Sequence, residues 1–231
     1  MTTLETLEHA RQPAGAISSM AAIRSARAES WIALGHIAAG IRPGMTERQA
    51  CELAGGFLEA HEAQRHRHPA IVRFGEGTSK ASSEPSRPGR VLGEKDIFLV
   101  DIAAVWEGRP GHAGDTFVAG DDPDMHACAD AARTLWREVG EHWRRHAADG
   151  RALHAYAVER ADAQGWRLDL DIDRHRADGL PCTLHRPGAL GDARSHPGTG
   201  MLWVLEVRIA HPSRPFGAFY KDLVLPDEEM D

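Results

Sequence analysis

The chain has 231 residues, which is enough for one large α/β domain or two small ones. Its 42% apolar and 26% charged residues are typical of a soluble globular protein, and no apolar stretch is long enough to cross a membrane. A net charge of −7 argues against a nucleic-acid-binding protein of the usual basic kind.

Residues 1–17 carry Pro13 and Gly15 and show little periodicity, so we expect a loose arm before one domain that spans residues 18–231. The arm has acidic residues and no apolar core, and it therefore does not resemble a signal peptide. The three cysteines are odd in number and far apart in the sequence, which indicates a reducing compartment rather than a disulfide scaffold. We expect a cytoplasmic protein.

Two helices are expected first. Residues 18–40 place apolar side chains close to one helical face, although Arg27 interrupts the stripe. Pro43 then breaks the helix, and Thr46 with Gln49 forms a capping box for a second helix over residues 47–63. The apolar face of the first helix consists of Met20, Ile23, Trp31, Leu34 and Ile37.

A strand over residues 68–75 and a polar loop over 76–95 lead into the most apolar part of the chain. Residues 97–108 are apolar on both faces, which predicts a buried strand. Glycines and a proline between positions 108 and 111 predict a turn, and residues 115–120 return as a second strand.

The C-terminal half predicts two helices followed by strands. Asp122 is the expected N-cap of a helix with Pro123 in its first turn, and a second helix covers about residues 151–164. Strands are expected at 165–172, 201–210 and 217–225. The apolar face of the first of these helices consists of Met125, Ala129, Ala132, Leu135, Trp136, Val139 and Trp143.

The run VDIAAVWEGRPGHAGDTFVAG, which ends at Gly120, resembles the metal-binding hairpin of the methionine aminopeptidase/creatinase family, the pita-bread metallohydrolases. In that family the run reads approximately VDIGAxYxGYxSDxTRTFxxG, and both aspartates are metal ligands. A gapless alignment puts Asp101 on the first aspartate and His112 on the second. The resemblance covers about residues 18–228 and implies an α/β (α+β) fold, with a curved, mostly antiparallel sheet and helices packed outside it.

Three further fragments occur in the order that the family has. DRHRADGLPC puts His175 on the ligand histidine, and GMLWVLEVRI puts Glu206 on a glutamate ligand. FYKDLVL puts Lys221 where the family keeps its second, bridging glutamate. In the family, the carboxylates at two of these positions bridge a pair of metal ions. Here the same two positions are His112 and Lys221, and the lysine ammonium group repels cations. These replacements argue against a two-metal aminopeptidase.

The resemblance leaves ligands for one metal: His112, His175 and Glu206. Two histidines and one carboxylate are the donor set of non-heme Fe(II) enzymes, so Fe(II) is the favoured divalent metal, with Zn(II) or Mn(II) as alternatives. We expect Asp101 and Lys221 to form an ion pair in the position of the lost metal and to supply charge or a proton. If the alignment contains a gap, Asp115 takes the place of His112 as the ligand. His185 is the alternative ligand to His175.

Two family histidines that assist catalysis are replaced by Glu84 and Cys182, and we expect these residues and Tyr220 to contact substrate. The favoured function is a metal enzyme with an oxidative reaction on a small amino-acid-like molecule. One alternative is a one-metal hydrolase of amides or peptides, and another is an inactive family member that binds a peptide or protein. We expect a homodimer as a possible assembly and neither nucleic acid nor membrane as a partner.

Overall fold

The computed structural model of the chain describes residues 20–63, 68–80, 89–146, 150–168, 173–176 and 203–225, with the backbone alone at 173–176 and 203. The expected arm at residues 1–17 lies outside the described residues, as do Glu84, Cys182 and His185.

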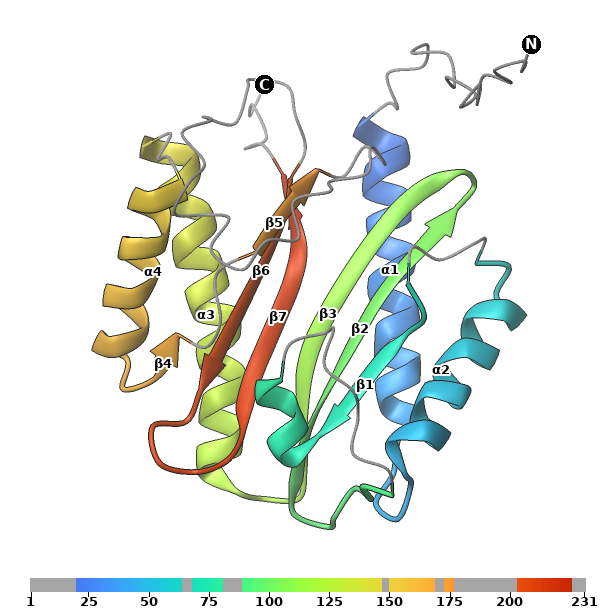
Figure 1. The fold of residues 1–231 in the computed structure, drawn as a ribbon. Coiled ribbons are helices and arrows are strands. Elements are labelled where there is room, and N and C mark those ends of the chain that lie inside the picture. The colour runs from blue at the N-terminus through green and yellow to red at the C-terminus, as the bar shows by residue number, and fades with distance from the viewer. Residues whose placement is uncertain are drawn as a thin grey trace, which may run out of the picture.

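Within the described residues, four α-helices and seven strands form a two-layer arrangement of helices on a sheet. The strands follow the order β1-β2-β3-β7-β6-β4, with β5 also paired to β6, and every pairing is antiparallel. The predicted class, a mostly antiparallel sheet with helices outside it, is confirmed (Figure 1). The elements are α1 Met20–Gly40, α2 Glu47–Ala60, β1 Ile71–Phe74, the 3₁₀ helix η1 Gly75–Ser79, β2 Asp96–Trp106, β3 Arg109–Ala119, α3 Pro123–His146, α4 Gly150–Ala163, β4 Arg167–Leu168, β5 Asp173–Arg176, β6 Trp203–Ala210 and β7 Gly217–Val224.

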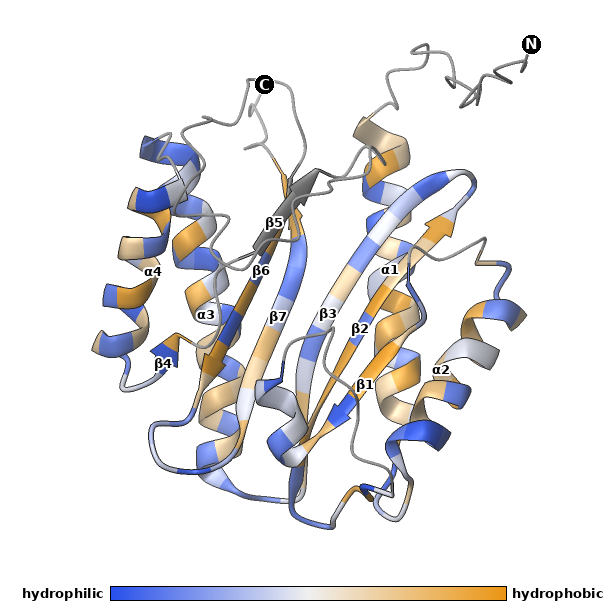
Figure 2. Ribbon diagram, in the orientation of Figure 1, coloured by the Kyte–Doolittle hydropathy of each residue, from blue (hydrophilic) through white to orange (hydrophobic). Residues whose placement is uncertain are grey.

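The helices bury their apolar faces in two clusters on the same side of the sheet. Helices α1 and α2 pack on β1, β2 and β3, whereas α3 packs on β6 and β7 and contacts α4. Figure 2 shows β2 as apolar along most of its length, which agrees with its complete burial at residues 96–104. No described helix combines the length and the apolar character that a membrane span requires.

The capping signals predicted from the sequence are confirmed at two helices. Thr46 caps α2 with a full capping box, in which its side chain accepts from the Gln49 backbone and Gln49 reaches back to the Thr46 N–H. Asp122 accepts from the backbone of Asp124 and Met125 at the start of α3. All predicted apolar-face residues of α3 are buried except Trp136, which packs against the cluster from its edge.

Arg27 interrupts the apolar stripe of α1 because it has a partner in the sheet. Its guanidinium donates to both carboxylate oxygens of Asp222 in β7, at 2.8 and 2.5 Å. Asp222 is fully buried, and a buried carboxylate needs such a partner. The bond ties α1 to a strand that lies 195 residues further along the chain.

The predicted turn of the β2–β3 hairpin is wrong in its extent. Strand β3 begins at Arg109, which pairs with Trp106, so the turn consists of Glu107 and Gly108 alone. Both turn residues have positive φ, 48° and 76°, as a two-residue type I′ turn requires. His112 consequently lies within a strand, and its side-chain direction is fixed by strand alternation.

Strands β3 and β7 are joined by one register pair, Gly114 with Lys221. The Thr116 hydroxyl adds to this joint, because it accepts from Phe219 N–H at 2.8 Å and donates to Phe219 C=O at 2.9 Å. Both bonds are buried. The side chain of Thr116 therefore replaces part of the backbone ladder between the two halves of the sheet.

We expect the stabilising effect of Asp122 to disappear only in strong acid. Hydrogen bonds from Arg214 are the main cause that lowers the pKa of Asp122 from 3.8 to about 2. Because the folded pKa is lower than the unfolded one, the contribution is complete above about pH 4 and is lost as the pH falls through about 2. Urea denaturation of the wild type and Asp122→Asn should show a stability gap that closes over that range. A gap that stays constant with pH would contradict the assignment.

Candidate functional site

The register of the sheet aligns charged residues from three strands in one row. Asp101 of β2 pairs with Gly114 of β3, Gly114 pairs with Lys221 of β7, and Lys221 pairs with Glu206 of β6. Directly paired residues point to the same face of a sheet. We call Asp101, Lys221 and Glu206 the charged row.

The charged row lies on the face that the α-helices do not cover. Ile102 follows Asp101 and Val207 follows Glu206, and both pack in the clusters beneath the helices. Since successive strand residues point to opposite faces, the charged row belongs to the other side. On that side η1 covers one end of β6 and β7, because Arg208 donates to Thr78 C=O at 3.1 Å.

Lys221 donates a hydrogen bond from Nζ to the Asp101 carboxylate, which confirms the predicted contact between these two side chains. The lysine side chain is 1% exposed and the aspartate side chain 4%, so water screens this ion pair little. Gly114 lies between them in the row. A Cβ there would lie 3.1 Å from Lys221 Cβ and 2.4 Å from the Phe219 ring, so only glycine leaves space for the lysine to reach β2.

His112 lies beside the charged row on the same face. It is two residues from Gly114 in β3, it pairs with Ala103 of β2, and it is buried. Position 175 in β5 pairs with Val204, two residues from Glu206. The backbone thus brings the three positions that the sequence predicted as metal ligands, 112, 175 and 206, to one region of the sheet.

The donor types at these positions fit one metal ion better than two. Asp101 is bonded to an ammonium group, which would repel a cation bound at the same oxygens. Across the described side chains, which exclude that of His175, no three His, Cys, Asp or Glu residues are grouped for metal binding. The ligand set that includes His175 therefore stays a prediction.

Asp115, the alternative ligand to His112, points to the opposite face of β3 by strand alternation. Its carboxylate accepts from Arg133 Nε of α3 at 3.0 and 3.1 Å, and it also accepts from Thr116 N–H. Burial raises the pKa of Asp115, and the nearby Arg133 opposes that shift. The structure thus holds Asp115 in an ion pair beneath α3 and does not bring it to the charged row.

Tyr220, predicted to contact substrate, also lies on the helix-covered face. Its ring stacks on Trp31 of α1 with centroids 5.4 Å apart and meets Trp136 of α3 edge-on at 5.3 Å. Burial raises the pKa of its hydroxyl. Tyr220 immediately precedes Lys221 in β7. Strand alternation therefore turns its side chain away from the face on which we expected substrate.

The sequence reasoning missed three arginines that organise this region. Arg133 holds Asp115, Arg27 holds Asp222, and Arg208 joins η1 to the sheet while its guanidinium lies 4.6 Å from the Phe219 ring centre. The role of Arg27 could have been predicted from the sequence, since a charge within an apolar stripe requires a partner. No local sequence pattern predicted the roles of Arg133 and Arg208, because their partners lie in distant elements.

Comparison with known proteins agrees with the geometry of the sheet. The model of metallopeptidase family M24 matches residues 21–228. The chain belongs to this family. No curated protein sequence matches the chain at a significant level.

Solved structures share the fold of this family member at low sequence identity. Prolidase from Pyrococcus furiosus has a TM-score of 0.70 and 15% identity over 90% of this chain and 60% of its own. X-Pro aminopeptidase from Thermotoga maritima has a TM-score of 0.66 and 18% identity, over 87% of this chain and 56% of its own. A His350Ala variant of Escherichia coli aminopeptidase P has a TM-score of 0.69 and 15% identity, over 90% of this chain and 53% of its own. The chain thus spans between 53% and 60% of the length of these proteins.

Proposed function

We propose that the chain is a one-metal hydrolase that cleaves an amide or peptide bond in a small amino-acid-like substrate. The observation that carries the proposal is the buried ion pair between Lys221 and Asp101, which puts a fixed positive charge in the charged row. Membership of a metallopeptidase family, and similarity to a prolidase and aminopeptidases, favour hydrolysis over the oxidative reaction that the ligand types first suggested. Iron loses its preference over zinc or manganese for the same reason.

In this proposal His112, Glu206 and His175 hold the single divalent metal. A bound metal of this kind supplies a nucleophilic water at neutral pH and polarises a carbonyl group. Lys221 contributes a donor for negative charge that develops on the substrate oxygen, since charge stabilisation is strong where water is excluded. Asp101 keeps the ammonium in position through its hydrogen bond.

The test is a panel of small amides and dipeptides assayed with the protein loaded with iron, zinc, manganese or cobalt. We expect cleavage of selected small amides and no general activity on Met- or Xaa-Pro peptides. The reason is that His112 and Lys221 occupy the two positions where the family has carboxylates that bridge a metal pair. Efficient turnover of those peptides with cobalt or manganese would overturn the one-metal proposal. Dioxygen consumption without amide cleavage would restore the oxidative reaction, and inertness toward the whole panel would favour an inactive binding protein.

A further inference from the structure

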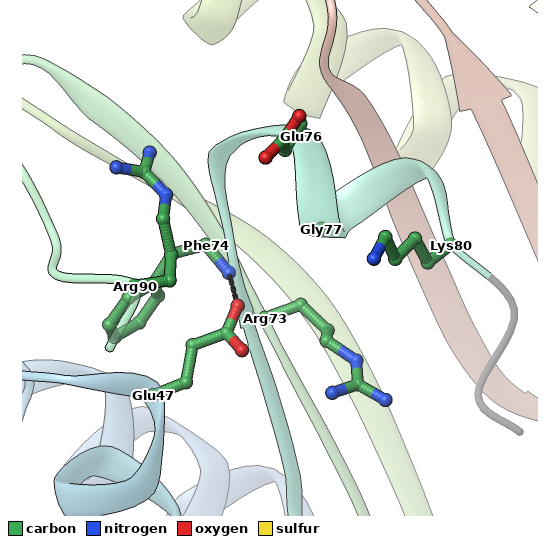
Figure 3. Close-up of a pocket in the computed structure, with 7 residues that line it drawn as sticks. All are labelled: Glu47, Arg73, Phe74, Glu76, Gly77, Lys80 and Arg90. Atoms are coloured by element: carbon green, nitrogen blue, oxygen red, sulfur yellow. Dashed lines mark hydrogen bonds between the residues drawn. The ribbon is translucent and has the colours of Figure 1, made fainter. Parts of the chain in front are cut away.

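The buried carboxylate of Glu47 joins α2 to the edge strand β1 and leaves no space for a ligand. In Figure 3 it reaches across to β1, where it accepts from Phe74 N–H at 2.7 Å. The gap around these side chains has room for about one water molecule. A site for a further ligand is therefore expected where solvent reaches the side chains.

Two histidines near the end of α3 form such an accessible pair. His142 and His146 are four residues apart in the segment HWRRH, so the helix turn puts both imidazoles on the same face. Their ring centres are 4.6 Å apart. His146 is exposed and His142 is partly exposed. A dissolved ion can therefore reach both rings.

The ring of His142 is held by the neighbouring helix. It stacks on Tyr156 of α4, with ring centres 3.8 Å apart and an angle of 10° between the planes. Arg160 of α4 also donates to Glu138 of α3, at 2.9 and 3.0 Å, which ties the same two helices together. Figure 1 shows α3 and α4 side by side. The packing thus restricts one imidazole before any ligand binds, which lowers the entropy cost of binding.

The ring nitrogens of this pair differ from those of other histidines in how they are used. His61, His68 and His126 each place a ring nitrogen at hydrogen-bond distance from a backbone carbonyl oxygen, at 2.9, 2.8 and 3.0 Å. In the described part of the chain, no hydrogen bond or ion pair engages a ring nitrogen of His142 or His146. Their nitrogens are therefore suited to bind a metal ion.

The charges around the pair permit a cation. Arg145 forms an ion pair with Glu141 at 3.4 Å, and Arg144 donates to Leu225 C=O at 3.1 Å, so both guanidinium groups are directed to other partners. The pair lies in the last turns of α3, and the C-terminal end of a helix carries partial negative charge. This charge favours a bound cation.

We propose that His142 and His146 form a peripheral site for one divalent transition metal ion of the kind that imidazole prefers, such as Zn(II), Ni(II) or Cu(II). Each imidazole supplies one nitrogen, and water completes the coordination of the ion. A spacing of four residues is the one at which a helix presents two histidines to a single zinc ion. The proposal does not depend on the hydrolytic function, because neither histidine belongs to the charged row or to the ligands proposed beside it.

Two protein donors hold a metal ion less tightly than three. The ion bound by this pair therefore exchanges with solvent, and gel filtration of the protein removes it. Metal held by the three donors proposed around Glu206 stays with the protein under the same treatment. The peripheral site must accordingly be measured by titration.

The test is calorimetric titration of the full chain with the nickel(II) chelate of nitrilotriacetate. The chelator leaves two neighbouring coordination positions of the nickel ion open, which two imidazoles can fill together. The chelate is too large to reach His112, which is 4% exposed. We expect saturable binding that weakens about tenfold or more in His142→Ala and in His146→Ala, because a single imidazole loses the advantage of two linked donors.

His126→Ala is the matched control, since it removes an exposed histidine from the other end of the same helix. This variant should bind the chelate like the wild type. Absence of saturable binding, weakening in only one variant of the pair, or equal weakening in His126→Ala would overturn the proposal. If His142→Ala fails to fold by circular dichroism because its contact with Tyr156 is lost, His146→Ala compared with His126→Ala still decides.

Discussion

We expect Lys221→Met to lower the free energy of unfolding by about 3–5 kcal/mol, the usual cost of breaking a buried ion pair from one side. Methionine preserves the length of the side chain and its path over Gly114, so the variant removes the charge with little change in volume. Asp101 then remains buried without its ammonium partner. Urea denaturation of the full chain at neutral pH measures the loss.

Two controls distinguish the ion pair from a general effect of losing a lysine. Lys95→Met removes a lysine whose side chain is 69% exposed, and surface ion pairs contribute at most about 1 kcal/mol. The double variant Asp101→Asn/Lys221→Met removes both charges and should recover part of the stability lost in the single variant. A Lys221→Met protein as stable as the wild type would show that the pair does not hold the two strands together.

Local signals in the sequence predicted the elements whose causes are local. The Thr46–Gln49 capping box and the Asp122 cap fix where α2 and α3 begin, and each needs only the three or four residues around it. The apolar periodicity of α3 likewise predicted its buried face. The hairpin turn was misplaced because Pro110 and Gly111 are typical turn residues, whereas the chain turns one step earlier, at Glu107 and Gly108.

The features that the residues alone did not predict depend on long-range partners. No local pattern links Arg27 to Asp222 or Arg133 to Asp115, since these pairs form only when helices pack on the sheet. The meeting of Asp101 and Lys221 was predicted, but through the family resemblance, which supplied the strand order. Tyr220 was misplaced for a simpler physical reason: it is adjacent to Lys221 in a strand, and adjacent strand residues cannot face the same side.

The second large effect concerns metal content. We expect protein purified under anaerobic conditions to contain about one equivalent of transition metal per chain. We expect His112→Ala to contain none, because it removes one of the three proposed donors. Elemental analysis of the purified proteins measures both. Asp115→Asn is the matched control: it alters a side chain of the same strand that faces α3 and is bonded to Arg133, so its metal content should stay that of the wild type.

The same measurement tests the proposal that Lys221 limits the site to one metal. Lys221→Glu removes the ammonium group and returns a carboxylate to the position where the resemblance has a bridging ligand, beside Asp101, across Gly114. If repulsion by Lys221 limits the site, this variant should bind more metal than the wild type, which Lys221→Met should not. Metal loss in Asp115→Asn with retention in His112→Ala would exchange the roles of the two residues. Two equivalents in the wild type would show that the ion pair does not take the place of a metal.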